Sequence, residues 1–291
     1  MPIILWVTPP ASVIVRARDE ARDIERTLAA LRRQTREVEL IVVDSGSTDG
    51  TVEIAQRYCD QLIAIPQSEF TYGRALNVGA RAASAPIHFA LSAHCAPERD
   101  DWVERSLAHY ARPEVAATNG VGWLEGRRWH EPFLQTAADG ERPRGFSNHA
   151  SSWRGAVWEE IPFDEDIAAA EDLEWAWRVL AEGWAIAFDP ALRVDASHAW
   201  TTASELYRRE RRCAQALAAL PDAPLYRARD VARDWWSEMP DDRHSPFAHR
   251  FLNHRRWAGL AGRYLGSRAA VSRRRSRAAP TAPASEQPPG G

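Results

Sequence analysis

The first hundred residues alternate between short apolar runs and longer segments in which apolar residues recur at helical spacing. Four apolar runs predict buried strands, at Ser12–Ala17, Leu40–Val43, Leu62–Ile65 and Ile87–Leu91. The segments between and after them predict helices, one with Ile24, Leu28 and Leu31 on a single face and others at Thr51–Cys59, Arg74–Ser84 and Asp101–Tyr110. Repeated strand–helix units, with strands apolar on both faces, are typical of a parallel sheet covered by helices. We therefore expect an α/β fold with a Rossmann-like, mostly parallel central sheet and flanking helices.

The pattern loosens between Gly122 and Phe163, and we expect a long functional loop there. Regular spacing returns in a helix at Glu171–Glu182 and a strand at Trp184–Phe188. An Arg-rich amphipathic helix follows at about Ala203–Leu220, with further helices to about Leu265. The expected organisation is a main α/β domain at residues 1–200, a C-terminal helical extension at 201–266 and a disordered tail at 267–291.

Composition narrows the classes of protein. Of 291 residues 45% are apolar, enough to bury a core, and a formal charge of -3 argues against a general nucleic-acid binder. Three scattered cysteines imply no disulfide framework. No stretch approaches the length and apolarity of a membrane span or signal peptide, so we expect a cytoplasmic protein, with peripheral contact at the inner face of the plasma membrane as a further expectation.

Asp44 stands at the carboxyl end of a predicted buried strand, where open α/β sheets bind ligands. Its carboxylate could accept hydrogen bonds from a uracil-type N–H or a ribose hydroxyl. The turn that follows, SGSTDG, offers backbone N–H groups and hydroxyls, and we expect Ser47, Thr48 or Asp49 to cap the next helix. The turn lacks GxGxxG and the P-loop lysine, which excludes the dinucleotide and ATP motifs.

Three segments resemble a known family. SVIVRARDE at Ser12–Glu20, followed by LIVVDSGSTDGT at Leu40–Thr51, is similar to the opening of the family 2 glycosyltransferases, which have a GT-A fold. FTYGRALNVGARAA resembles a segment of one bacterial branch, and PFDEDIAAAEDLEWAWRVLAEGW resembles the acceptor-side motif. The resemblance covers about Ser12–Cys213. It implies inverting transfer of a sugar from a nucleotide diphosphate donor.

The resemblance implies roles for single residues. Asp172 would be the general base that takes the acceptor's proton, with Glu171 beside it; acids in a first helical turn are also favoured by the helix dipole alone. Arg74 lies in the family-like segment YGRALN, which implies a contact with the donor. Arg81 is expected to be an ordinary solvated arginine. The residues that we expect to contact the donor are Arg16, Glu20, Asp44, Ser47, Gly73, Arg74, Asn77 and Ser92; for Asn77, capping of a turn is an equal alternative.

One triplet departs from the family pattern. Where the fourth strand usually ends in a metal-binding Asp-x-Asp, this chain has Ser92-Ala93-His94. Alternation on an extended strand would point Ser92 and His94 to one side and Cys95 to the other, which argues against a Cys/His dyad. His94, with His198 at a position where relatives often supply a second ligand, would hold a divalent cation, Mn²⁺ more readily than Mg²⁺. Direct contact of His94 with phosphate, without metal, is the alternative.

Acceptor recognition is the least constrained feature. Among thirteen tryptophans, those at positions 123, 129, 153 and 158 lie in or beside the irregular stretch and could stack on sugar rings, with ordinary packing as the alternative. We expect Trp175 and Trp177 to pack in the core. The segment YRRERR at Tyr207–Arg212 could meet anionic lipid headgroups, although a solvated charged face is the ordinary interpretation.

The sequence thus predicts an inverting glycosyltransferase for cell-surface polysaccharide synthesis. It would use a UDP-, GDP- or dTDP-sugar donor and a glycan or lipid-linked acceptor. Two alternatives stay open. One is a sugar nucleotidyltransferase, although VRARDEARDI lacks the Gly-rich loop expected of that class. The other is an inactive nucleotide-sugar-binding partner subunit, against which the Glu171–Asp172 pair argues.

Overall fold

The computed structural model describes residues 9–120, 123–124, 127–128, 130–139, 145–196, 202–218, 226–237 and 254–278. The chain divides into two compact units. The first holds the described residues from Pro9 to Ala196 together with Trp236 and Ser237, and the second holds the other described residues from Thr202 onward. None of the helices in the described ranges combines the length and hydropathy needed to cross a bilayer.

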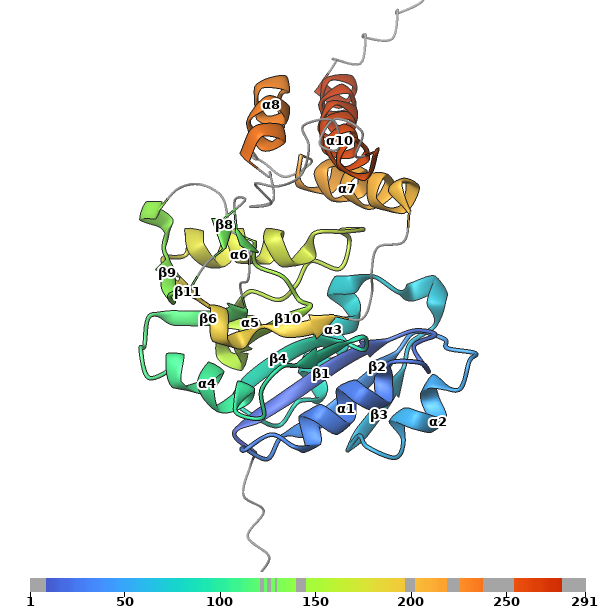
Figure 1. Ribbon diagram of the computed structural model, residues 1–291, viewed down its shortest axis with the longest axis vertical. Helices are drawn as coiled ribbons and strands as arrows, with labels where there is room; N and C mark the ends of the chain where they lie inside the picture. The colour runs from blue at the N-terminus through green and yellow to red at the C-terminus, as the bar shows by residue number, and fades with distance from the viewer. Residues whose placement is uncertain are drawn as a thin grey trace, which may run out of the picture. The chain divides into compact units, whose positions relative to one another are not determined.

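An eight-stranded sheet with the order β3–β2–β1–β4–β10–β6–β11–β9 forms the centre of the first unit (Figure 1). Its strands are β1 (Ala11–Ala17), β2 (Glu39–Asp44), β3 (Gln61–Ala64), β4 (Ile87–Ser92), β6 (Val115–Gly120), β9 (Phe133–Gln135), β10 (Ala150–Arg154) and β11 (Ala185–Asp189). Strands β10 and β9 run antiparallel to their neighbours, and the other pairings are parallel. Two small antiparallel ribbons pair β5 (Cys95–Pro97) with β12 (Val194–Ala196) and β7 (Trp123–Leu124) with β8 (Arg127–Arg128). The predicted mostly parallel sheet is confirmed.

Helices cover both faces of the sheet. One face packs against α1 (Ile24–Arg32), α2 (Thr51–Ala55) and α4 (Trp102–His109), and the other against α3 (Tyr72–Ala82), α5 (Gly155–Glu160) and α6 (Glu171–Ala181). Short 3-10 turns lie at η1 (Gln67–Glu69), η2 (Ala137–Asp139) and η3 (Pro190–Leu192). Strand β1 shows why both faces are covered, since Val13 and Val15 enter one core and Ile14 the other.

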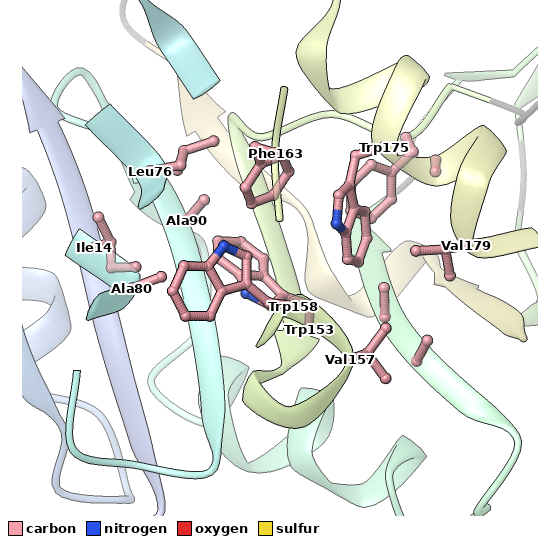
Figure 2. Close-up of a cluster of buried hydrophobic side chains, with 14 of the residues drawn as sticks. Ile14, Leu76, Ala80, Ala90, Trp153, Val157, Trp158, Phe163, Trp175 and Val179 are labelled. Carbon is pink, nitrogen blue, oxygen red and sulfur yellow. The ribbon is translucent and has the colours of Figure 1, made fainter. Parts of the chain in front are cut away.

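Aromatic rings fill the core beneath α3, α5 and α6 (Figure 2). The ring centroids of Trp153 and Phe163 lie 5.1 Å apart and those of Phe163 and Trp175 5.2 Å apart, within the range of favourable aromatic contacts. Trp153 and Trp158 are buried here, so the suggestion that they stack on an acceptor is wrong, and packing is their role. The predicted core position of Trp175 is confirmed. The side chains of Trp123 and Trp129 lie outside the described residues.

The expected loop between Gly122 and Phe163 is only partly irregular. It contains β9, α5 and β10, and β10 lies in the middle of the sheet. The sequence conceals this strand because its centre is polar. Ser152 is fully buried, and its hydroxyl lies 2.7 Å from that of Thr118 and 2.8 Å from that of Ser106. Hydrogen bonds between neighbouring elements therefore replace the apolar side chains that a central strand usually carries.

The second unit contains α7 (Ala203–Leu217), α8 (Ala228–Ser237) and α10 (His254–Ala278). Glycines let α10 approach α7 closely. A Cβ added to Gly262 would lie 2.6 Å from the carbonyl oxygen of Tyr207, and one added to Gly266 2.4 Å from that of Arg211. Because α10 continues to Ala278, the prediction of a disordered tail from residue 267 is wrong for its first part. That part is rich in Ala and Arg, which favour helix, and the Pro-rich remainder lies outside the described residues.

Candidate functional site

The carboxyl ends of β1, β2 and β4 bring three predicted donor residues to one edge of the sheet. In the parallel register Arg16 is paired with Ser92, and Ala17, which follows Arg16, is paired with Asp44. Arg16, Asp44 and Ser92 therefore occupy adjacent positions on neighbouring strands. This is the edge at which open α/β sheets bind ligands.

The turn after β2 is organised by the Asp44 carboxylate. One oxygen accepts hydrogen bonds from the backbone N–H groups of Gly46 at 2.9 Å and Ser47 at 3.0 Å, and the other accepts the Ser47 hydroxyl. Asp44 is 4% exposed and so is held in one orientation. A carboxylate fixed in this way can present its remaining lone pairs to a ligand without further loss of side-chain entropy.

The same turn is fastened to the segment after β1. The N–H of Asp19 donates to the Ser47 hydroxyl at 2.9 Å, that of Glu20 to the Thr51 hydroxyl at 2.7 Å, and that of Thr48 to the Asp19 carboxylate at 2.8 Å. Gly50 is the N-cap residue of helix α2, so none of Ser47, Thr48 and Asp49 takes that position, but the Asp49 carboxylate accepts the N–H of Thr51, the first helical residue, at 3.1 Å. These side chains instead hold two loops together at the strand edge.

His94 lies in a turn between β4 and β5, not on an extended strand. Its Nδ1 is 2.8 Å from Oε1 of Glu20, which links the ends of β4 and β1. Burial lowers the pKa of His94, but hydrogen bonds with the Cys95 side chain and the Glu20 carboxylate, together with the negative charge of Glu20, outweigh burial and raise the pKa to about 9. The expectation that His94 and Cys95 point apart is therefore wrong, because the turn breaks the strand alternation. Cys95 is fully buried, which still argues against thiol catalysis.

The expected metal site is not assembled by the described part of the chain. No three His, Cys, Asp or Glu side chains within it are placed to hold one ion. A protonated imidazole must also lose its proton before it can bind a metal. His198, the second ligand implied by the resemblance, lies outside the described residues. The described donors therefore do not fit a metal ion by themselves.

Glu171 and Asp172 begin α6, as predicted, after Ala170 in the left-handed conformation with a φ of 64°. Such a conformation is costly for a residue with a Cβ and is found mostly where surrounding structure enforces it. Glu171 is 4% exposed. Burial, and then the charge of Asp172, raise the pKa of Glu171 to about 7, and burial also raises the pKa of Asp172. The pair therefore holds a proton more strongly than free carboxylates do.

Asn148 is the residue of this site that the sequence did not reveal. Its backbone N–H donates to Oδ2 of Asp172 at 3.3 Å, and its side-chain amide donates to Oε1 of Glu171 at 3.5 Å. Its carbonyl oxygen accepts a hydrogen bond from Arg16 at 2.9 Å. Asn148 lies two residues before β10, the polar strand missed in the sequence, so no hydrophobic pattern marked its position.

Arg16 lies where the donor edge meets the acid pair. Its Nη1 is 3.4 Å from Oε1 of Glu171, and its guanidinium carbon is 5.4 Å from the centre of the Tyr72 ring. The side chain is 11% exposed. The structure therefore joins half-buried Arg16 and Asp172 with buried Asn148 and Glu171 in one network.

The three predicted donor residues on α3, which are Gly73, Arg74 and Asn77, contact residues 163–165 of the protein. Asn77 is buried, and its amide donates to the carbonyl of Phe163 at 2.8 Å and to Glu165 at 2.9 Å. Its oxygen accepts the N–H groups of Trp158 at 2.8 Å and Phe163 at 3.1 Å. All hydrogen-bonding positions of the amide are thus filled by protein groups. We interpret Asn77 as structural, in place of the donor contact expected from the sequence.

Gly73 and Arg74 contact the same neighbouring segment. A Cβ on Gly73 would lie 2.3 Å from the carbonyl oxygen of Asp164. Arg74 forms ion pairs with Glu69 and, at 3.5 Å, with Glu165. We therefore interpret the YGRALN segment as a structural element that packs against residues 163–165 and holds them in place, and not as a donor-binding loop. Residues 163–165 lead to the acid pair.

A family model described as Glycosyl transferase family 2 matches residues 12–157. The chain is 28% identical over 198 residues to the O-antigen chain rhamnosyltransferase WbaN of Salmonella anatum, covering 62% of this chain and 63% of that protein. It is 38% identical over 223 residues to the Validoxylamine A glucosyltransferase of Streptomyces hygroscopicus subsp. jinggangensis, covering 60% of this chain and 52% of that protein. The matches thus span less than two thirds of either relative.

Among solved structures, the chain is similar to the mannosyltransferase PcManGT from Pyrobaculum calidifontis in complex with GDP-Man and Mn²⁺. The TM-score is 0.60 at 21% identity, and the match covers 96% of this chain and 78% of that one. Staphylococcus aureus TarS matches with a TM-score of 0.52 at 14% identity, over 89% of this chain and 55% of that one. At these identities the likeness concerns the fold.

Proposed function

This chain belongs to glycosyl transferase family 2 and has a GT-A fold, and from that premise we propose that it transfers a sugar from a nucleotide diphosphate donor to an acceptor hydroxyl with inversion. The observation that carries the proposal is the pair of buried Glu171 and half-buried Asp172, which is linked through Arg16 to the strand edge that presents Asp44. A nucleotide site alone would need no acid pair beside it.

On the donor side we assign the nucleotide to the edge formed by Asp44, Ser47 and Ser92. Asp44 supplies an acceptor for a base N–H or ribose hydroxyl, because its carboxylate is already fixed by the turn. Glu20 and His94 border the same edge, and a protonated His94 would face the donor's phosphate charge.

On the acceptor side we assign the general base to Asp172. Its carboxylate takes the proton of the acceptor hydroxyl as that oxygen forms a bond to the anomeric carbon. The bond from that carbon to the diphosphate oxygen breaks on the opposite face, and the nucleoside diphosphate leaves with the bonding electron pair. The raised pKa of Asp172 suits this role, since a base must bind the proton that it removes.

The acceptor class follows from relatives only. Salmonella WbaN is described as an O-antigen chain rhamnosyltransferase, which supports a role in polysaccharide synthesis with a glycan or lipid-linked acceptor. Peripheral contact with the inner face of the plasma membrane would bring the enzyme to a lipid-linked acceptor. The donor's base and sugar stay open among UDP-, GDP- and dTDP-sugars.

A divalent cation is the alternative to direct phosphate contact by His94, and a deprotonated His94 together with His198 would then hold it. PcManGT was solved with Mn²⁺, which supports cation use in this fold. The described residues do not form such a site alone, so no step of the proposed mechanism depends on the ion.

Thermal unfolding with a panel of UDP-, GDP- and dTDP-sugars, each with and without Mn²⁺, tests the proposal. We expect at least one sugar nucleotide to raise the Tm, and that donor to release nucleoside diphosphate when a glycan or lipid-linked acceptor is added. Stabilisation without turnover across an acceptor panel would favour the inactive binding subunit. Release of pyrophosphate from a sugar phosphate and a nucleoside triphosphate would favour the nucleotidyltransferase. No stabilisation by any nucleotide would contradict the whole proposal.

A further inference from the structure

Two roles are open to Arg16, contact with the donor and stabilisation of the acid pair, and its contacts distinguish them. Its position at the carboxyl end of β1 suggested contact with a donor diphosphate. Its guanidinium, however, points to the acid pair and its surroundings: Nη1 lies 3.4 Å from Glu171 and Nη2 2.9 Å from the carbonyl oxygen of Asn148. Tyr72 covers one face of the guanidinium. The side chain is 11% exposed, and both of its terminal nitrogens already contact groups of the protein.

A nearby cation stabilises the ionised form of the acid pair more than it would stabilise exposed carboxylates. Glu171 and Asp172 are adjacent on one helical turn, and each is penalised by burial when it is ionised. Among described residues, the charged group that faces the pair from another element is Arg16 of β1, which lowers the pKa of both acids. Asn148, which faces them from the segment before β10, is uncharged, and within α6 the two acids face each other.

Asn148 completes the arrangement by fixing directions. Its backbone N–H and side-chain amide reach different acids of the pair, and its carbonyl oxygen receives Arg16. The Ser151 hydroxyl donates to its side-chain oxygen at 2.8 Å, which orients the amide so that its N–H₂ faces Glu171. Asn148 is 1% exposed, so its polar atoms are committed to these partners.

We propose that Arg16 and Asn148 are positioning residues of the acid pair. Arg16 is its counter-cation, and Asn148 is the bridge that fixes the side chains of Arg16, Glu171 and Asp172 relative to one another. This rests on the proposed function in that Asp172 is the base whose carboxylate they hold. It replaces the donor-contact role for Arg16 that the sequence suggested. The consequence is that the strand carrying the donor edge also sets the protonation of the acceptor-side base.

The test is a carboxyl-carbon NMR titration of Glu171 and Asp172 in protein labelled with ¹³C in its Asp and Glu side chains, assigned with Glu171→Gln and Asp172→Asn. It needs neither donor nor turnover, so its outcome is independent of whether the proposed reaction is correct. Arg16→Met removes the cation and keeps much of the apolar stem. Arg16→Lys keeps the charge and serves as a second variant should Arg16→Met fold poorly. Arg81→Met is the matched control, because Arg81 is on α3, is more than half exposed and pairs with Glu165 instead.

We expect Arg16→Met to raise the titration of the pair by about one pH unit or more, Arg16→Lys to raise it less, and Arg81→Met to leave it unchanged. Asn148→Ala should raise mainly the titration of Glu171, because the backbone N–H to Asp172 remains. Isothermal titration with UDP and GDP should show nucleotide affinity within about threefold of the unmodified protein in Arg16→Lys. An unshifted carboxyl titration in Arg16→Met would overturn the proposal, as would a loss of nucleotide affinity in Arg16→Lys with the titration unchanged.

Discussion

Gly73 approaches Asp164 so closely that a Cβ added to the glycine would stand 2.3 Å from the carbonyl oxygen of Asp164. This contact joins the first turn of α3 to the segment that leads into α6. Asn77, one turn further along α3, binds Phe163 and Glu165 of the same segment. The position of the acid pair therefore depends on a helix that carries none of its carboxylates.

Gly73→Ala should destabilise the protein by about 1 to 3 kcal/mol, because the backbone of Asp164 must move to admit the methyl group. The measurement is the free energy of unfolding in urea. Gly259→Ala in α10 is the control, since its added Cβ would meet nothing closer than 3.7 Å. Equal stability of Gly73→Ala and the unmodified protein would refute the close contact.

Asn77→Ala should lower the free energy of unfolding by at least about 2 kcal/mol, because the N–H of Trp158 and the backbone of Phe163 lose buried partners. Nucleotide affinity, measured by isothermal titration, should stay within about threefold of the unmodified value. A variant of normal stability that no longer bound nucleotide would restore the donor-contact interpretation of Asn77.

The periodicity of apolar residues was sufficient to predict β1 to β4 and the helices between them, since these elements bury continuous apolar faces. It could not predict β10, because Ser151 and Ser152 are buried there as hydrogen-bonding groups and look like loop residues in the sequence. The same limit concealed Asn148, whose importance comes from partners 23 or more residues away.

Motif position was a weaker guide to role. Asp44, Ser47, Glu171 and Asp172 lie where the resemblance implied, at the strand edge and the start of α6. Gly73, Arg74 and Asn77 lie in another segment that resembles the family, yet they contact the segment at 163–165. The backbone approach of Gly73 to Asp164 and the ion pair of Arg74 with Glu165 are long-range contacts, and neither can be read from local sequence.

Stability should depend on pH through Glu171. Its pKa, raised by burial and by Asp172, is about 7 in the folded protein against an ordinary value of 4.5. Between these two values the folded state therefore keeps a proton that the unfolded chain releases. The contribution of the protonated Glu171 carboxyl to the stability of the fold is fully present below about pH 4.5 and is lost as the pH rises through about 7. In Glu171→Gln this loss should disappear, so the free energy of unfolding of the variant, relative to that of the unmodified protein, should be about 1 to 3 kcal/mol more favourable at alkaline pH than at acid pH.

Urea unfolding from about pH 5 to pH 8 measures this difference. Glu182→Gln is the control, because Glu182 is an exposed acid at the end of the same helix. Parallel pH profiles for Glu171→Gln and the unmodified protein would show that Glu171 does not carry the raised pKa.

The most direct measurement is turnover by Asp172→Asn with nucleotide affinity determined on the same preparation. The substitution is close in shape and removes the proton acceptor. We predict that release of nucleoside diphosphate, with the donor that stabilises the protein best, falls by about 100-fold or more, while the Kd for the nucleotide stays within about threefold. Asp166→Asn, which changes an exposed acid in the preceding segment, should retain turnover. Undiminished turnover in Asp172→Asn would contradict the assignment of Asp172 as the base.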